Sequence, residues 1–391
     1  MKKKILFVVD SLNCGGAEKS LVSLLNTFDY EKYDVFLQLM SVEGVFLTNV
    51  PQEVKFLPEL DYVVFSKSSW SYKLKHLNYL LKKVKIFLGM RFERKKGRLH
   101  GSQAYWKSAN SAFKTVKENF DVAVAWGQGT PTHYIAEKVK AKKLFAIINA
   151  DYESLGLNRD FDANFYIKYS KIFVVSDKLN VMTKSVFPEF EDKIHTLYDI
   201  NNAKLIEQLA SVENPFNDIM STKIVTVGRL VSAKGYDLLI KAAKILKDKS
   251  IDYKWFIIGE GPERKFIENE IEKFELKNNV FLLGQKQNPY VYMSNADVYV
   301  QTSKNEGFCL TLAEARILNI PVISTNFDAV YNQIEHMQNG IITEKNGESI
   351  ASAIVELLNN DNLREKIIKN LLTQKKGNIE EIDKLYRFIE E

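Results

Sequence analysis

The sequence predicts an α/β protein made of two Rossmann-like domains, each with a doubly wound parallel sheet. Short apolar segments alternate with segments of helical periodicity along most of the chain, and the apolar segments fall into two groups. The length of 391 residues suits two domains better than one. Hydrophobic residues make up 46% and charged residues 26% of the chain, which excludes a disordered tail and a bundle of membrane spans.

Ten apolar runs are the expected strands. They are continuous rather than alternating, which is typical of strands covered on both faces in parallel sheets. We expect the strands of the first domain at residues 5–9, 35–39, 122–125, 144–148 and 172–175. We expect those of the second domain at residues 224–227, 255–258, 280–283, 298–301 and 321–324.

The domain boundary is expected near residues 198–222, where Asn201, Asn202, Asn214 and Pro215 interrupt the pattern. We therefore assign residues 1–200 to an N-terminal domain and residues 201–372 to a C-terminal domain. Residues 373–391 are expected to be helical at their end, because apolar side chains recur there at helical spacing and no strand follows.

A basic segment at residues 67–100 interrupts the first domain. Between residues 67 and 98 the chain has eleven Lys or Arg residues and one acid, Glu93. Six apolar residues recur there at spacings of 4, 3, 4, 3 and 4, which predicts an amphipathic helix: Trp70, Leu74, Leu77, Leu81, Val84 and Leu88. Two interpretations remain open. The helix lies on an anionic membrane surface, or its stripe packs on the first domain and its lysines are solvated.

Composition also bears on location and partners. Two cysteines, Cys14 and Cys309, exclude a disulfide framework and fit a reducing cytoplasm. The first apolar run resembles a buried strand rather than a signal peptide, and no run reaches the roughly 18 residues of a spanning helix. We expect a cytoplasmic protein, peripheral on the inner face of the cell membrane if the basic segment binds there. Nucleic acid is not expected, because no binding motif accompanies the basic segment.

Three segments have the composition of phosphate-binding loops. Gly15-Gly16 follows the first strand and precedes a helix, whose N-terminal N–H groups suit an anion. The segment 228–235 carries Arg229 and Lys234 at the carboxyl end of a strand, where open α/β sheets bind ligands. The segment 306–314 places Gly307 before a helix that begins near Leu310. Taken alone, the first two segments are better explained by an ordinary turn and a solvated loop.

Together these segments resemble the family-4 retaining glycosyltransferases, which have the GT-B fold. The resemblance rests on an E-x7-E pattern at Glu306 and Glu314 and on G-R-x4-K-G at residues 228–235. It extends to residues 259–262, 295–297 and 15–18, and it is strongest over residues 222–345. It implies two domains facing across a cleft, with the C-terminal helix packing back on the N-terminal domain.

The resemblance also implies roles for individual residues. Arg229 and Lys234 would hold the donor diphosphate, Glu306 would contact the transferred sugar, and Glu314 would bind ribose hydroxyls. Catalysis would therefore depend on Glu306, Arg229 and Lys234. The remaining donor-binding positions would be Gly16, Asn149, Gly307, Phe308, Cys309, Leu310 and Thr311.

Two positions depart from the family pattern. Asn149 stands where many relatives have a His that faces the donor sugar, and an amide carries neither proton nor charge. Asp199 stands where relatives often have Asn. A competing motif, Asp160-Phe161-Asp162, spells the D-x-D of metal-dependent glycosyltransferases, but it lacks that fold's context.

The expected function is retaining transfer of a hexose from a nucleotide-diphosphate sugar, UDP-linked, without a metal or other cofactor. The expected acceptor is a cell-surface polysaccharide, a lipid-linked glycan or a wall polymer. Two alternatives remain open, a sugar-nucleotide-binding partner subunit with little catalysis and a GT-B epimerase of free sugar nucleotides. The sequence does not indicate an oligomeric state.

Overall fold

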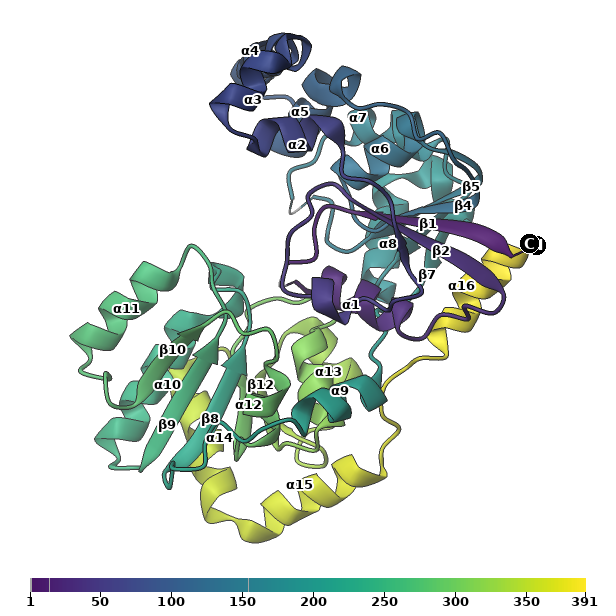
Figure 1. Cartoon of the computed structure of the whole chain (residues 1–391). Coiled ribbons are helices and arrows are strands. Elements are labelled where there is room, and N and C mark those ends of the chain that lie inside the picture. The colour runs from purple at the N-terminus through teal and green to yellow at the C-terminus, as the bar shows by residue number, and fades with distance from the viewer. Residues whose placement is uncertain (1, 14, 154) are drawn as a thin grey trace. The chain divides into compact units, whose positions relative to one another are not determined.

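The computed structural model describes residues 2–13, 15–153 and 155–391, which form two compact units (Figure 1). Unit 1 comprises the chain up to Ile200 together with Glu380–Glu391, and unit 2 comprises Asn201–Ile379. Each unit contains one parallel sheet with helices around it. The predicted pair of doubly wound parallel sheets is therefore confirmed.

The strands of unit 1 are β1 (Lys3–Val9), β2 (Tyr33–Leu39), β3 (Lys55–Phe56), β4 (Asn119–Ala125), β5 (Lys140–Ile148), β6 (Lys171–Val174) and β7 (Ile194–Thr196). Its helices are α1 (Gly16–Leu25), α2 (Asp61–Lys67), α3 (Trp70–Lys75), α4 (Leu77–Lys96), α5 (Gly101–Ala109), α6 (Thr130–Lys138), α7 (Arg159–Tyr166), α8 (Asp177–Val186) and α16 (Glu381–Glu390). Short 3-10 turns add η1 (Leu47–Asn49), η2 (Asn110–Ala112) and η3 (Pro188–Lys193).

The strands of unit 2 are β8 (Thr222–Val227), β9 (Tyr253–Ile258), β10 (Val280–Gly284), β11 (Val298–Gln301), β12 (Val322–Thr325) and β13 (Ile341–Thr343). Its helices are α9 (Ala203–Ala210), α10 (Tyr236–Asp248), α11 (Arg264–Lys273), α12 (Tyr290–Ser294), α13 (Leu310–Ile317), α14 (Gly347–Asn359) and α15 (Asp361–Thr373). The 3-10 turns are η4 (Ser232–Lys234) and η5 (Asp328–Asn332).

The sheet of unit 1 has the order β3-β2-β1-β4-β5-β6-β7, with every pairing parallel. The interior strand β1 pairs Ile5 with Val35 on one side and with Val122 on the other. Successive side chains of a strand point to opposite faces, and all of Ile5–Val8 are fully buried. Both faces of this sheet are therefore covered, as the continuous apolar run predicts.

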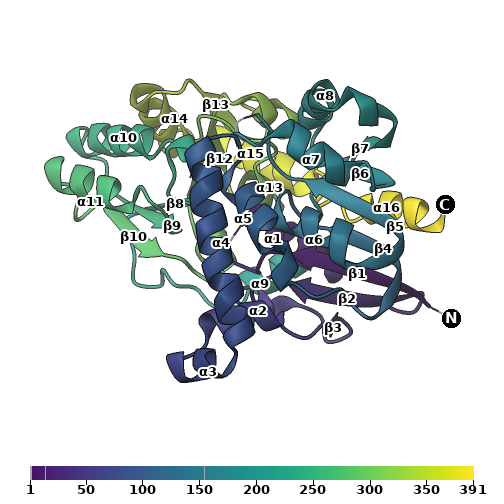
Figure 2. The same cartoon turned by 90° about the horizontal axis from the view of Figure 1, so that it is seen from above.

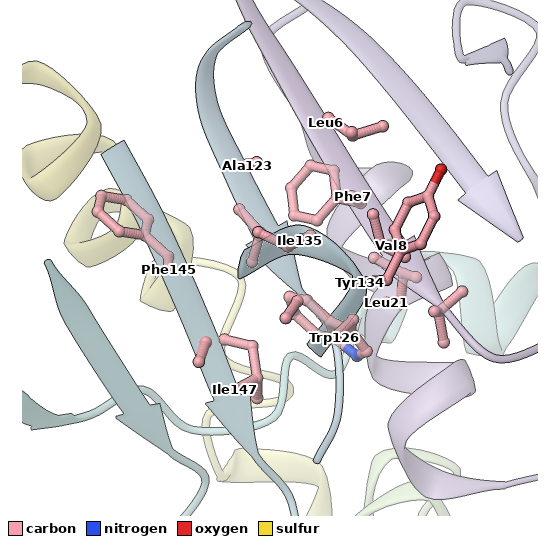
Figure 3. Close-up of a cluster of buried hydrophobic side chains, with 14 of the residues drawn as sticks. Leu6, Phe7, Val8, Leu21, Ala123, Trp126, Tyr134, Ile135, Phe145 and Ile147 are labelled. Carbon is pink, nitrogen blue, oxygen red and sulfur yellow. The ribbon is translucent and has the colours of Figure 1, made fainter. Parts of the chain in front are cut away.

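The core of unit 1 joins the central strands to the helices beside them. Figure 3 shows Phe7 and Val8 of β1 with Ile135 of α6 and Leu21 of α1 around them. Trp126, at the end of β4, packs edge-on against Phe7, with ring centroids 5.9 Å apart. These contacts fix the loops that follow β1 and β4 to a rigid base.

The last helix, α16, packs within unit 1 although the chain reaches it from unit 2. The ring of Tyr386 stacks on Tyr33 at 5.1 Å, and its hydroxyl accepts a hydrogen bond from the backbone N–H of Asp29 at 2.7 Å. Leu385 and Ile389 are buried in the core of unit 1. The predicted return of the C-terminal helix to the N-terminal unit is confirmed.

The sheet of unit 2 has the order β10-β9-β8-β11-β12-β13, again all parallel. From β8 the chain builds outward through β9 and β10 and then returns to place β11 on the other side of β8. The strand order therefore reverses between β8 and β11. In open α/β sheets such a reversal opens a crevice at the carboxyl ends of the strands.

The ten predicted strands are all present. Among the described residues the structure has three further strands that were not predicted from the sequence. The missed strands β3, β7 and β13 have two or three residues each and lie at sheet edges. So short a segment contains too few side chains to show a period.

The basic segment forms two helices rather than one, α3 and α4, with a break at His76. Figure 2 shows α4 along its length, with α3 at its N-terminal end and α5 beside it. The interpretation that the predicted stripe packs on the first domain is wrong, because all six of its residues are exposed: Trp70, Leu74, Leu77, Leu81, Val84 and Leu88. Among the residues described, no helix is long and apolar enough to cross a membrane.

Candidate functional site

The candidate site lies in unit 2, at the carboxyl ends of the neighbouring strands β8 and β11. The loop 228–235 follows β8, and the segment 302–309 joins β11 to α13. The backbone N–H of Lys304 donates to the carbonyl of Ala233 at 2.8 Å, and the Thr302 hydroxyl donates to the carbonyl of Lys234 at 2.8 Å. The two loops are therefore bonded to each other where the strand order reverses.

Glycines permit the close approach of these loops. Gly235 has a φ of 67°, and a Cβ there would lie 2.0 Å from the carbonyl oxygen of Thr302. Gly259, after β9, has a φ of 149°, and a Cβ there would lie 1.9 Å from the carbonyl oxygen of Gly228. A side chain at either position would push the loop 228–235 away from the sheet edge.

The loop 228–235 turns back toward β11 and brings Lys234 to Glu306. The Lys234 Nζ lies 2.5 Å from Glu306 Oε1. The Lys234 side chain is 22% exposed and that of Glu306 is 12% exposed, so the pair is largely shielded from solvent. Arg229 is exposed in the same loop and makes no ion pair within the described part of the chain.

The local charges favour a protonated Lys234. Burial opposes the charged form of the amine, but the carboxylate of Glu306 outweighs this effect, and the pKa of Lys234 is raised above its ordinary value. Arg229 acts in the opposite direction, as a neighbouring positive charge. Two cations and one carboxylate therefore meet at this edge, a balance that a diphosphate group would complement.

Gln301, at the end of β11, links the residues of this site, and the sequence analysis did not select it. Its amide nitrogen donates to Ser303 Oγ at 2.7 Å and to Glu306 Oε1 at 3.3 Å. Its amide oxygen accepts from the Tyr299 hydroxyl at 2.6 Å and from Thr311 Oγ1 at 3.2 Å. Gln301 is 1% exposed, so these bonds hold Glu306 and the start of α13 in one fixed geometry.

Ser303 completes the set of donors around Glu306, since its hydroxyl donates to Glu306 Oε1 at 2.6 Å. The sequence feature that could have identified Gln301 and Ser303 is the polar run of residues 301–303 at the end of an apolar strand. All three of its residues are buried. Buried polar groups need partners, so such a run at a strand end indicates a built site.

The start of α13 supplies free backbone donors beside Glu306. Cys309 precedes the helix with a φ of 70°, in the left-handed region, and Leu310 is its first residue. The first N–H groups of a helix have no partner inside the helix and carry partial positive charge. Gln333 holds this turn by donating from its amide to the carbonyl of Phe308. The predicted positions Gly307 to Thr311 therefore lie at the N-terminal end of α13.

Glu314, one turn further along α13, lies deeper than Glu306. It is 2% exposed, and its Oε1 accepts from the hydroxyl of Tyr290 in α12 at 3.0 Å. The structure thus places both carboxylates of the E-x7-E pattern on one segment but at different depths. The Tyr290 contact was not predicted, because its partners lie in two helices that no sequence pattern connects.

Cys309 is a poor nucleophile in this position. Burial and the nearby carboxylate of Glu306 raise the pKa of its thiol far above the ordinary value. Cys14, the other cysteine, lies outside the described residues.

The two remaining predicted positions belong to unit 1, at the carboxyl edge of its sheet. Gly16 begins α1 after β1, and Asn149 follows β5. The loop after β4 connects them, because Trp126 Nε1 donates to the carbonyl of Ala17 at 2.7 Å. From the same loop, Gln128 Oε1 accepts from the backbone N–H of Asn149 at 3.2 Å. Trp126 and Gln128 thus fix both predicted loops, and neither was selected from the sequence.

The two aspartates of the D-x-D motif have different surroundings. Asp162 is buried, with Oδ1 lying 2.7 Å from His133 Nε2 and Oδ2 accepting from the Tyr152 hydroxyl. Asp160 is exposed and pairs with Arg159 at 3.0 Å. The two carboxylates therefore have separate partners. Within residues 2–13, 15–153 and 155–391, no group of three or more potential ligands lies in place for a metal ion.

Comparison with known proteins finds glycosyltransferases among the chains similar to this one. Residues 213–373 match the family model described as glycosyl transferases group 1, and this range includes every predicted site residue of unit 2. An uncharacterized glycosyltransferase of Methanocaldococcus jannaschii is 30% identical over 167 residues, 41% of either chain. Poly(ribitol-phosphate) alpha-N-acetylglucosaminyltransferase of Staphylococcus aureus is 28% identical over 276 residues, 67% of this chain and 55% of the relative. The chain spans about half the length of these curated relatives.

Among solved structures, HepE of Anabaena in complex with UDP-glucose matches with a TM-score of 0.68 and 16% identity. The match covers 98% of this chain and 100% of that one. At this identity the likeness establishes the fold alone. Because it includes both units, the predicted GT-B fold is confirmed.

Proposed function

We propose that the chain is a retaining glycosyltransferase that moves a hexose from a UDP-sugar to a cell-surface polysaccharide, lipid-linked or wall-polymer acceptor. The observation that carries this proposal is the group formed by Lys234, Glu306 and the N-terminus of α13, where the strand order of the unit 2 sheet reverses. It combines a cation, a carboxylate and the N-terminal backbone N–H groups of a helix at one edge of the sheet. A sugar linked to a diphosphate has the complementary groups, anionic oxygens beside hydroxyls.

Lys234 and Arg229 would neutralise the diphosphate, and the N–H groups of residues 308–311 would bind its oxygens. The ion pair of Lys234 with Glu306 suggests how the donor would enter. Phosphate oxygens would draw the ammonium of Lys234 toward themselves, and Glu306 would then accept a hydrogen bond from a sugar hydroxyl. Gln301 and Ser303 would keep Glu306 in position during this exchange, because both donate to Glu306 Oε1.

The residues of the site would act mainly by electrostatics. The bond between the anomeric carbon and the diphosphate oxygen breaks, and the acceptor hydroxyl oxygen bonds to the same carbon from the same face. The proton of that hydroxyl passes to the departing diphosphate. Negative charge develops on this leaving group, and Arg229, Lys234 and the start of α13 would stabilise it. No covalent enzyme intermediate is needed.

Glu314 would bind the ribose hydroxyls of the nucleotide. Its buried carboxylate accepts a hydrogen bond from the Tyr290 hydroxyl, and a carboxylate is the kind of acceptor that the vicinal hydroxyls of a ribose require. In unit 1, Asn149 has a side-chain Oδ1 that is buried without a partner among the described residues. We propose that the Asn149 amide and the Gly16 turn contribute to the donor sugar site by hydrogen bonding alone, without acid or base chemistry.

The proposed acceptor class follows from the relatives. The staphylococcal relative is named for a poly(ribitol-phosphate) acceptor, a phosphate-rich polymer, and the curated match covers two thirds of this chain. The net charge of +5 fits an anionic acceptor or carrier. The choice of UDP is supported by the likeness in fold to a UDP-glucose complex.

The direct test is to incubate the purified chain with a panel of nucleotide sugars and to follow nucleoside diphosphate release and sugar products by mass spectrometry. The proposal predicts slow donor hydrolysis without acceptor and faster release with a matching acceptor. Binding without any turnover across the panel would instead support a partner subunit, to which Asn149 points. An epimerised sugar nucleotide formed without acceptor would identify an epimerase.

A second measurement tests the absence of a metal requirement. The proposal predicts that turnover persists in EDTA, because Lys234, Arg229 and the start of α13 supply the positive charge at the diphosphate. Complete loss of turnover in EDTA, restored by a divalent cation, would contradict this mechanism.

A further inference from the structure

The apolar stripe of α4 faces away from the unit that carries it. Leu77, Leu81, Val84 and Leu88 recur every three or four residues and are all exposed, with Leu81 at 73%. The opposite face of the helix packs inward through Ile86, which is buried. Isolated exposed apolar residues are ordinary on protein surfaces, but a continuous stripe of them indicates an interaction site.

The helix α3 extends this surface. Trp70 is 73% exposed and Leu74 is also exposed, so the large apolar side chains continue across the break at His76. Phe87 and Phe92 widen the stripe on α4. We call this set the outer stripe: Trp70, Leu74, Leu77, Leu81, Val84, Phe87, Leu88 and Phe92.

Positive charge surrounds the outer stripe on α4. At 3.6 residues per turn, Lys85 and Lys96 fall on one flank, and Lys83 and Arg94 fall on the other. Lys96 lies over the ring of Phe92 at 4.2 Å from its centroid, so this cation and the apolar surface are contiguous.

The single acid of this segment is turned away from the surface. Glu93 is buried on the inward face of α4, and its Oε1 lies 3.0 Å from Lys107 Nζ of α5. Its charge is therefore balanced within unit 1. The exposed part of α3 and α4 combines large apolar side chains with cations and presents no carboxylate among residues 67–98.

We infer that α3 and α4 form a membrane-docking surface, on which the outer stripe inserts into the interface of an anionic bilayer while the flanking lysines and arginines contact lipid phosphates. An apolar face bordered by Lys and Arg, with an aromatic residue at one end, is the pattern of a helix that lies in the membrane interface. A second copy of this chain fits less well, because pairing two such faces would bring the flanking lysines and arginines of both copies together.

The inference gives a location to the proposed function but does not depend on it. The residues of the outer stripe belong to unit 1, whereas Lys234, Glu306 and Glu314 belong to unit 2. Vesicle binding and sugar transfer are therefore separate measurements, and either can fail without the other.

The test is sedimentation of the full chain with vesicles of equal parts phosphatidylglycerol and phosphatidylcholine, and with vesicles of phosphatidylcholine alone. We expect the chain to pellet with the anionic vesicles and much less with the neutral ones, and added salt should weaken binding because it screens exposed charges. Replacing Leu77, Leu81 and Leu88 by Gln should reduce the partition coefficient at least tenfold. Replacing Lys82, Lys83, Lys85, Lys95 and Lys96 by Gln should reduce it by up to about fivefold for each residue that contacts lipid.

Matched controls separate the surface from general effects of charge and polarity. Five exposed lysines of unit 2, replaced by Gln, remove the same charge and should leave binding unchanged: Lys249, Lys265, Lys345, Lys366 and Lys369. Ile167 and Val181 are exposed apolar residues elsewhere in unit 1, and their replacement by Gln should also have no effect.

Three outcomes would overturn the inference. The parent could stay in the supernatant with anionic vesicles at low salt, or the Leu-to-Gln variant could pellet as well as the parent. The parent could also form a dimer in lipid-free solution that the Leu-to-Gln variant abolishes, which would assign the face to a second copy. Circular dichroism of each variant shows whether unit 1 has kept its fold, and a variant with fewer substitutions replaces any that has not.

Discussion

Replacing Asp199 by Asn should stabilise unit 1 at neutral and alkaline pH, with little effect near pH 4. Asp199 lies just before the end of unit 1 and is buried. Burial raises the pKa of its carboxyl to about 7, although a hydrogen bond with Ser20 acts in the opposite direction. Asn has nearly the same shape, and its amide oxygen can still accept from Ser20.

The magnitude follows from proton linkage. In the unfolded chain the carboxyl ionises near pH 3.8, whereas the native state keeps its proton until about pH 7. The native state therefore binds more protons between these values, and its stability falls as pH rises through that window. A pKa difference of about three units corresponds to a penalty of about 4 kcal/mol, fully present above pH 7 and absent below pH 4. The Asp199→Asn variant would not carry this penalty, since an amide does not ionise.

The assay is urea unfolding followed by tryptophan fluorescence at a series of pH values. Trp106 and Trp126 are buried in unit 1, and Trp255 is buried in unit 2, whose transition serves as an internal reference. Asp192→Asn is the matched control, because Asp192 is exposed in the same unit. A stability difference between Asp199→Asn and the parent that stays constant from pH 4.5 to 8, or that grows toward acid pH, would refute the reasoning.

Two further changes test individual contacts. Gln301→Leu should lower kcat/KM for sugar transfer at least tenfold and destabilise unit 2 by about 1–3 kcal/mol. The reason is that Ser303, Glu306 and Thr311 lose a buried hydrogen-bond partner. Unchanged kinetics in a folded variant would show that Gln301 has no positioning role. Asp162→Asn should destabilise unit 1 by about 2–3 kcal/mol, since an amide cannot accept hydrogen bonds at both of its terminal atoms and one of the contacts with His133 and Tyr152 is lost. Urea unfolding measures this loss. A variant that stays as stable as the parent but loses a metal-dependent turnover would instead support a catalytic role for the D-x-D motif.

The sequence predicted the central strands of both sheets because their side chains are buried on both faces. Ile5–Val8 and Val298–Val300 are examples, fully covered in the structure and continuous in the sequence. The edge strands β3 and β13 escaped prediction because each has only two or three residues. A strand that is buried on both faces is recognisable by its continuous apolar residues, whereas a two- or three-residue strand at a sheet edge has no such pattern.

The site was predicted where local motifs carry it and missed where the tertiary structure assembles it. The loop 228–235 and the pair Glu306 and Glu314 follow from spacing and from a family resemblance. Gln301 and Tyr290 do not, because their roles depend on contacts between segments that are distant in the chain. The roles of the predicted residues in donor binding remain predictions, although the structure brings the unit 2 residues to one edge of the sheet.

The stripe of α4 shows the limit of periodicity. The spacing of Leu77, Leu81, Val84 and Leu88 predicts that they share one face of a helix, and they do. Periodicity does not say whether that face is covered. The buried residues of the inward face are instead Ile86 and Glu93. One is apolar and the other acidic, so an amphipathic pattern would not assign both to a buried face.

The most direct test of donor recognition is the rate of sugar transfer by Arg229→Ala and Lys234→Ala, measured as nucleoside diphosphate release with the donor found in the panel. If these cations stabilise the leaving diphosphate, each substitution should lower kcat by about 10²–10³-fold, the scale on which a lost oxyanion donor acts. Lys345→Ala, an exposed lysine of the same unit, should turn over like the parent. Parent-like turnover in both folded variants would contradict a diphosphate site at the carboxyl ends of β8 and β11.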